Sequence, residues 1–118
     1  VNWDRFMAAK DRAIEHLSQL HIQHLQEAGV ELIYGNTKFL DASTLDIEGR
    51  KVTADKILIA VGREAVKPDI PGIEYAITSR QMFELKQQPE HIAIIGSDQI
   101  AVKFAGSMNG LISKVTLV

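Results

Sequence analysis

The chain has 118 residues, enough for one ordinary domain, and its 46% apolar and 24% charged residues are typical of soluble globular proteins. Its formal net charge of −2 gives no electrostatic reason to expect a nucleic acid or an anionic membrane as partner. Cysteine is absent, which excludes a disulfide framework and a thiol nucleophile within these residues. The N-terminal residues lack a basic region followed by an apolar core, so we expect a cytoplasmic setting.

A long amphipathic helix is the first predicted element. Apolar residues recur at helical spacing from Phe6 to Leu25. Asn2 is the residue type expected at the N-cap of this helix, and Gly29 the type expected at its end. His21 and His24 stand three residues apart and could share a metal ion. Because no third ligand is near them, we interpret both as surface histidines and predict no metal site.

Short β-rich segments follow the helix. Alternating residues around polar turns predict an antiparallel meander, and a continuously apolar run after Lys56 predicts a strand covered on both faces. The predicted strands are residues 30–34, 37–40, 44–47, 51–53 and 56–61.

The next part of the chain has weaker signals. Residues 63–72 show neither helical nor strand periodicity, which predicts a crossover between units. Ser79 is expected to cap a short helix that ends at Leu85. Pro89 separates this helix from the final elements, so we place a domain boundary near residues 87–90 and predict domains at residues 1–88 and 89–118.

The last segment contains an altered dinucleotide-binding turn. An apolar strand, residues 92–95, leads into Gly96, and a helical pattern follows it, which is the context in which a G-x-G-x-x-G/A fingerprint has physical meaning. Gly96 is the first glycine of that fingerprint, and Ala101 occupies its third position. Asp98 replaces the middle glycine and puts a negative charge where a pyrophosphate would lie. The sequence therefore predicts that the architecture is kept and that phosphate binding is weakened.

Other candidate positions have two interpretations each. The amide of Gly62 could face a cofactor at the end of a strand, or Gly62 could be an ordinary turn glycine. Amides near Asn36 and Thr37 could bind an adenine edge, although a turn at the end of a strand needs no ligand. Lys103 could approach a phosphate or a nicotinamide, or it could face solvent. No pair of carboxylates and no Ser-His-Asp order predicts a catalytic residue.

Both ends of the sequence suggest a piece of a larger protein. The chain starts at Val1, and residues 114–118 predict a strand with nothing after it. A small complete domain is the alternative. In either case the edge of this last strand could pair with a second copy, so a homo-oligomer is one expectation.

Several motifs together resemble a known family. Thr53-Ala54-Asp55-Lys56-Ile57-Leu58-Ile59-Ala60-Val61-Gly62 is similar to T-A-D-H-I-L-I-A-T-G, and Pro68-Asp69-Ile70-Pro71-Gly72 is similar to P-D-I-P-G. Residues 100–106, with Asn109-Gly110-Leu111, resemble I-A-V-E-x-A-G with N-G-L. By these motifs the chain resembles the flavin-dependent pyridine nucleotide-disulfide oxidoreductases of the glutathione reductase type.

The resemblance implies an α/β fold. It would comprise part of a Rossmann-like FAD-binding domain with a β-meander, followed by the first β-α-β unit of an NAD(P)-binding domain. By analogy, one set of residues would line the FAD adenosine: Asn36, Thr37, Ala60, Val61 and Gly62. A second set would fall where the family binds NAD(P)H: Gly96, Ser97, Gln99, Ile100 and Lys103.

The resemblance also implies an activity for the whole enzyme. A hydride passes from NAD(P)H to FAD, and the reduced flavin then reduces a redox-active disulfide. Since this chain has no cysteine, we expect it to be inactive alone and to bind neither cofactor tightly. Its expected partner is the remainder of the parent enzyme. The alternatives are a self-associating module without catalysis and a small nucleotide-binding domain.

Overall fold

The structure is a computed structural model that describes residues 1–118, with small sheets and three α-helices. The helices are α1 (Trp3–Glu27), α2 (Ser79–Met82) and α3 (Gln99–Gly110), with a 3-10 turn at Ile73–Tyr75. The strands are β1 (Thr37–Phe39), β2 (Thr44–Ile47), β3 (Arg50–Thr53), β4 (His91–Ile94) and β5 (Lys114–Leu117). The chain divides into two compact units, one of residues 14–63 and one of residues 1–13 with 64–118. None of the helices combines the length and apolar character that crossing a membrane requires.

Helix α1 confirms the prediction from periodicity, including both of its ends. The side chain of Asn2 accepts a hydrogen bond from the Arg5 amide at 2.9 Å, which satisfies one of the free N–H groups of the first turn. Gly29 adopts a φ of 76° after the helix, and the Val30 amide donates back to the Leu25 carbonyl at 2.9 Å. This αL glycine with a backward hydrogen bond is a common way for a helix to end. No residue of α1 is buried.

The predicted meander is confirmed as a three-stranded antiparallel sheet in the order β1-β2-β3. Strands β2 and β3 pair Ile47 with Arg50, so only Glu48 and Gly49 connect them. Both residues have positive φ, 50° and 92°, as the two-residue turn of a hairpin requires. The Gly49 amide donates to the side chain of Asp46 at 2.9 Å, which holds this turn in place.

Two strand predictions in the same unit are wrong. Residues 30–34 and 56–61 form no strand, although both are apolar. In the second segment Leu58 is 88% exposed and Val61 is 89% exposed, whereas the sequence predicted a strand covered on both faces. Residues 55–66 make no backbone hydrogen bond. An apolar run becomes a buried strand only where neighbouring strands supply those bonds, and no neighbour pairs with this run.

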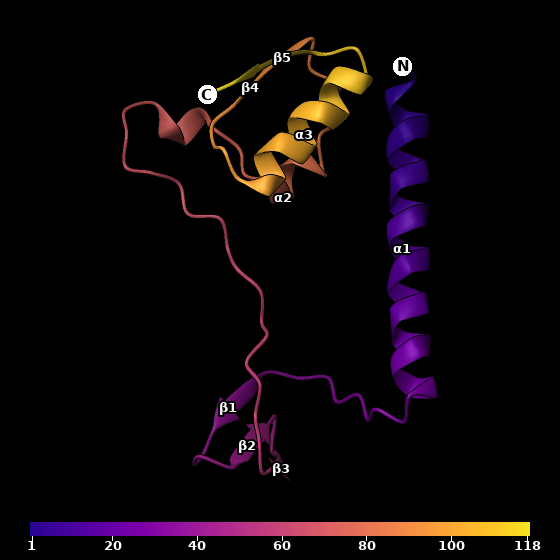
Figure 1. Cartoon of the computed structure of the whole chain (residues 1–118), viewed down its shortest axis with the longest axis vertical. Coiled ribbons are helices and arrows are strands. Elements are labelled where there is room, and N and C mark those ends of the chain that lie inside the picture. Colours follow the sequence, from indigo (N-terminus) through magenta and orange to yellow (C-terminus); the bar gives the residue numbers. More distant parts are fainter. The chain divides into compact units, whose positions relative to one another are not determined.

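The C-terminal part of the other unit confirms the predicted β-α-β order. Strands β4 and β5 are parallel, with Ile92 opposite Val115, and α3 contacts β5 (Figure 1). Hydrogen bonds extend this pairing at both ends, because the Lys114 amide donates to Glu90 and the Gly96 amide to Val118. Three of the four buried residues of the chain lie here, Ala101, Met108 and Ser113, and the fourth, Met82, lies in α2.

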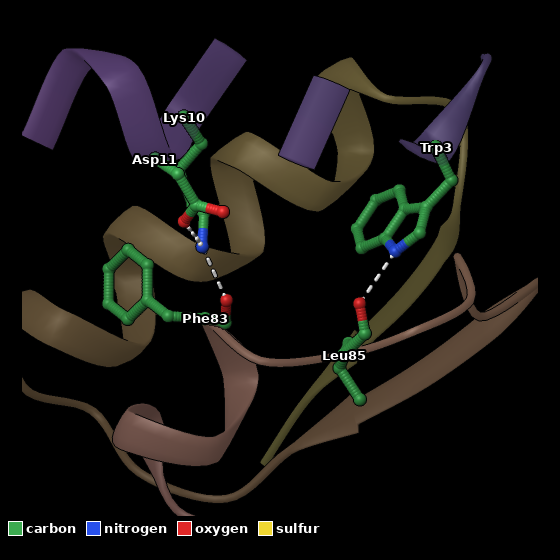
Figure 2. A network of polar contacts seen from close by, with 5 residues as sticks. All are labelled: Trp3, Lys10, Asp11, Phe83 and Leu85. Carbon is green, nitrogen blue, oxygen red and sulfur yellow. Dashed lines mark hydrogen bonds and ion pairs between the residues drawn. The ribbon is translucent and has the colours of Figure 1, made fainter. Parts of the chain in front are cut away.

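The first turns of α1 contact the segment after α2, as Figure 2 shows. The indole Nε1 of Trp3 donates to the Leu85 carbonyl at 2.7 Å, and Lys10 Nζ donates to the Phe83 carbonyl at 2.6 Å. Lys10 also forms an ion pair with Asp11 at 2.7 Å. These bonds satisfy backbone oxygens that α2 and its C-terminal turn leave unpaired.

Helix α2 is shorter than the sequence predicted, and it begins one residue earlier. Thr78 is its N-cap instead of Ser79, and the helix ends at Met82 instead of Leu85. The Thr78 amide donates to the side chain of Gln81 at 3.0 Å. A glutamine three residues after the cap stabilises a helix start through this bond, which is the reason that Thr78 and not Ser79 caps the helix.

Candidate nucleotide-binding site

The turn between β4 and α3 has the geometry that dinucleotide sites use. Strand β4 ends at Ile94, the chain turns at Gly96, and α3 begins at Gln99 after its N-cap Asp98. Backbone hydrogen bonds from Val118 to Ile94 and from Gly96 to Val118, both 2.9 Å long, fix the end of the strand beside β5. The helix N-terminus therefore starts at the carboxyl end of a parallel strand, where open α/β sheets bind ligands.

Gly96 makes the tight turn and lets the helix approach the strand. Its φ is 138°, a conformation that side chains with a Cβ rarely adopt. A Cβ at this position would lie 3.6 Å from the Cβ of Ala101, which is itself buried. A Cβ at this distance would make only an ordinary contact, so the backbone conformation, and not a lack of space, favours glycine at position 96.

Asp98 has a role that the sequence analysis missed. Its Oδ1 accepts a hydrogen bond from the Ala101 amide at 2.8 Å, and its backbone carbonyl accepts from Val102 at 3.1 Å. The carboxylate therefore caps α3, where the partial positive charge of the helix N-terminus favours a negative group. The signal was present in the sequence, since Asp is among the preferred N-cap residues immediately before a helical pattern.

The other predicted residues of this turn lie on its open side. Ser97, Gln99, Ile100 and Lys103 are exposed, and Ile100 keeps 51% of its surface accessible. The amides of Gln99 and Ile100 have no hydrogen-bond partner in the chain, in contrast to the Ala101 amide. Neither Asp98 nor Lys103 forms an ion pair. The first turn of α3 thus has two amides without a partner, those of Gln99 and Ile100, next to the Ala101 amide, which is bonded to Asp98.

In the other unit, Asn36 is held by the hairpin turn. Its amide donates to Glu48 Oε1 at 3.1 Å, and its side-chain nitrogen lies 3.4 Å from the same oxygen. The preceding Gly35 has a φ of 152°, and a Cβ there would lie 2.9 Å from Ile47 Cγ2. Thr37 follows as the first residue of β1. The Asn36 amide, which the sequence analysis considered as a donor to an adenine edge, therefore donates to the Glu48 carboxylate.

Ala60, Val61 and Gly62 do not form the predicted strand end. They lie in an exposed segment without regular secondary structure, and Gly62 has a φ of 80°. No hydrogen bond links them to Asn36 or Thr37. The five residues predicted for the FAD side therefore lie in two separate segments of one unit, without a shared polar network.

Two further features complete the description of possible sites. An open groove of about 410 Å³ runs beside Trp3, Lys10 and Phe83, and none of the predicted site residues lines it. The structure holds no group of three or more His, Asp or Glu side chains placed to bind a metal ion. The strand-to-helix turn at Gly96 is consequently the feature with the most specific geometry.

The sequence and the fold both match known proteins of one class. The family model described as pyridine nucleotide-disulphide oxidoreductase matches residues 4–118. The chain belongs to this family. Its architecture, an α/β chain with small sheets, matches part of a flavoprotein disulfide reductase fold.

Individual relatives are similar to this chain over almost its whole length. The chain is 53% identical over its whole length to a glutathione reductase from Nostoc sp. and 42% identical over 97% of its length to the chloroplastic/mitochondrial glutathione reductase of Pisum sativum. Among solved structures, it matches the Cu(II) complex of the HOCl-induced flavoprotein disulfide reductase RclA from Escherichia coli, with a TM-score of 0.80 at 27% identity.

These matches cover only part of each relative. The chain spans 26% of the Nostoc protein, 21% of the Pisum protein and 28% of the RclA chain. The residues described above therefore correspond to about a quarter of a disulfide reductase subunit.

Proposed function

We propose that this chain is a fragment or degenerate relative of a glutathione-reductase-type flavoprotein disulfide oxidoreductase, and that it corresponds to part of the FAD-binding and NAD(P)H-binding regions of that enzyme. In such an enzyme a hydride passes from NAD(P)H to FAD and on to a redox-active disulfide. The observation that best supports the proposal is the 53% identity to a glutathione reductase over all 118 residues. The parallel β4-α3-β5 unit, with Gly96 at its turn, agrees with the start of a Rossmann-like dinucleotide domain.

The proposal divides the chain between two cofactor regions. Residues 1–88 would belong to the FAD domain, in which Asn36, Thr37 and residues 60–62 face the adenosine side. Residues 89–118 would open the NAD(P)H domain. Where the family binds NAD(P)H, this chain would have the turn that Gly96 and Ser97 form and the first turns of α3, with Gln99, Ile100 and Lys103.

The exposed apolar segments fit a protein that needs its remaining domains. Leu58, Ile59 and Val61 are at least 67% exposed, and α1 buries none of its apolar residues. Surface of this kind is typical of interfaces that are covered by another part of a protein. We therefore propose the rest of the parent enzyme as the main partner of this chain.

Alone, the chain should not reduce disulfides, because it contains no thiolate that could carry electrons to a substrate. The test is to mix the purified chain with NADPH, FAD and oxidised glutathione and to follow nicotinamide absorbance. We expect no oxidation above a control without protein. Steady oxidation that depends on the chain would contradict the proposed inactivity.

A second candidate is self-association without catalysis. Strands β4 and β5 pair only with each other, so each keeps an unpaired edge, and Leu117 and Val118 at the end of β5 are 46% and 76% exposed. An open edge with apolar side chains can pair with a second copy. Sedimentation at increasing concentration distinguishes the two candidates, since a strict monomer at high concentration argues against the self-associating module.

A further inference from the structure

The turn between β4 and α3 contains a negatively charged side chain, that of Asp98. The first helical amides of α3 are the donors that a pyrophosphate would use in a site of this kind. One of them, the Ala101 amide, donates instead to Asp98 Oδ1 at 2.8 Å. A pyrophosphate oxygen and this carboxylate cannot bind the same donor, so the turn as it stands does not fit a pyrophosphate.

Charge acts in the same direction as this occupied donor. Asp98 forms no ion pair, and Lys103 on the same helix forms none with it. An incoming pyrophosphate would therefore meet an unneutralised carboxylate as well as one missing donor. Two negative groups in contact repel each other, and the repulsion grows as water is excluded between them.

The rest of the turn is arranged for close approach of a ligand. Gly96 has no side chain to obstruct the turn, and Ala101 packs against it. The amides of Gln99 and Ile100 are unpaired. The obstacle to a pyrophosphate is thus concentrated in one side chain, and the surrounding backbone keeps the geometry of a binding turn.

We infer that Asp98 is an internal replacement for the dinucleotide pyrophosphate, which stabilises α3 and at the same time excludes NAD(P)H from this turn. The inference rests on the proposed location of the dinucleotide at the β4-α3 turn. By this inference Asp98 has two opposite effects, because it stabilises α3 and weakens nucleotide binding. Removal of the whole side chain should therefore weaken the cap and strengthen nucleotide binding together.

Three variants separate the cap from the charge. Asp98→Gly removes both and restores the glycine of the fingerprint. Asp98→Asn keeps a side chain that can cap and removes only the charge. Glu90→Gln, as a matched control, removes one negative charge from an exposed residue before β4, at the end of the strand away from the turn. If Asp98→Gly fails to fold, Asp98→Asn still tests the effect of charge.

The first measurement is the affinity for NADPH and, separately, for NADH, by calorimetric titration of the 118-residue chain. We expect Asp98→Gly to bind at least about tenfold more tightly than the unaltered chain, because repulsion is removed and one donor is freed. Asp98→Asn should lie between the two, and Glu90→Gln should show no such gain. Equal affinities of the unaltered chain and both Asp98 variants would overturn the inference.

The second measurement reports the cap without any ligand. Hydrogen exchange of the Ala101 amide should be faster in Asp98→Gly than in the unaltered chain, whereas Asp98→Asn and Glu90→Gln keep it protected. Faster exchange without tighter binding would confirm the cap and overturn the exclusion of the nucleotide. Tighter binding that perturbs amides elsewhere, and not those of residues 99–101, would instead contradict the proposed location of the dinucleotide.

Discussion

Residues 91–118 and residues 54–63 are both rich in apolar side chains, but they differ in what their backbones bond to. In the first region, β4 pairs with β5, and α3 between them buries Ala101 and Met108. In the second region the backbone makes one hydrogen bond, from Ala54 to Ser43, and Leu58 is 88% exposed. A parallel strand needs a partner that a crossover connection brings back beside it, and α3 provides that connection in the first region alone.

The difference between these two regions shows that apolar composition does not by itself produce a hydrophobic core. The β-α-β unit contains its own strand partner within 28 residues, so its side chains become buried. The run at residues 56–61 has equally apolar side chains and no partner strand among the described residues. We expect mutations to report this contrast directly.

The largest expected effect is in the core of the β-α-β unit. Met108 is 3% exposed, so Met108→Ala should lower the free energy of unfolding by about 3 kcal/mol through lost contacts and a cavity. Leu58→Ala, at an 88% exposed position, should change it by less than about 0.5 kcal/mol. Urea denaturation followed by circular dichroism measures both. Similar losses in the two variants would remove the contrast between the regions.

A smaller effect tests the meander, which belongs to the same unit as residues 54–63. Gly35→Ala would place a Cβ 2.9 Å from Ile47 Cγ2 at a φ of 152°, and we expect a loss of about 2 kcal/mol. Gly106→Ala is the matched control, because a Cβ there meets no atom within 4 Å and alanine favours the helix. Thermal denaturation should show opposite shifts for the two variants. A stabilised Gly35→Ala chain would contradict this packing.

The C-terminus of α3 offers a stabilising change. Ile112 is 86% exposed and has a φ of 69°, in the αL conformation that a β-branched residue rarely adopts. Hydrogen bonds from Ile112 to Asn109 and from Ser113 to Met108 show a Schellman motif, which favours glycine at this position. Ile112→Gly should therefore raise the free energy of unfolding by about 1 kcal/mol. A loss of stability would mean that the isoleucine side chain makes contacts that outweigh its strain.

The smallest effect is a pH dependence in the β1-β2 turn. Hydrogen bonds from the Ser43 amide, and then from the side chain of Thr44, hold the pKa of Asp41 below its ordinary value of 3.8. Because the pKa of the folded state is lowered, the stabilisation is complete above the pKa of the unfolded chain. It is lost as the pH falls through the lower pKa of the folded state. Carboxyl carbon shifts measured by NMR should give a midpoint below 3.8, and a midpoint at or above that value would contradict these bonds.

Local signals in the sequence were sufficient for the elements whose contacts are close in the chain. The caps of α1, the meander and the β4-α3-β5 order all follow from turn residues, caps and periodicity. The strand at residues 56–61 could not be judged in this way, since its burial depends on distant partners. The same limit applies to Ala60, Val61 and Gly62, whose proposed role needs an ordered strand end.

The candidate turn was located from the sequence, which also identified the charge of Asp98 but not its hydrogen bond to α3. The spacing from Gly96 to Ala101 identified the turn, and Asp98 was recognised as a charge at a ligand position. Its hydrogen bond to the Ala101 amide depends on the N-cap conformation, with φ −76° and ψ 173°, which the helix start at Gln99 imposes. Aspartate is a preferred N-cap residue, but the sequence analysis did not interpret Asp98 as a cap, and only the structure shows its bond to a helix amide.

The most direct test of the central claim follows the backbone amides of α3 by NMR while NADPH is added to the unaltered chain. If Asp98 occupies the anion position, the signals of Gln99, Ile100 and Ala101 stay unchanged up to millimolar nucleotide, a concentration at which even weak phosphate sites fill. Saturable shifts of these three signals at micromolar NADPH would show an open anion site and contradict the account.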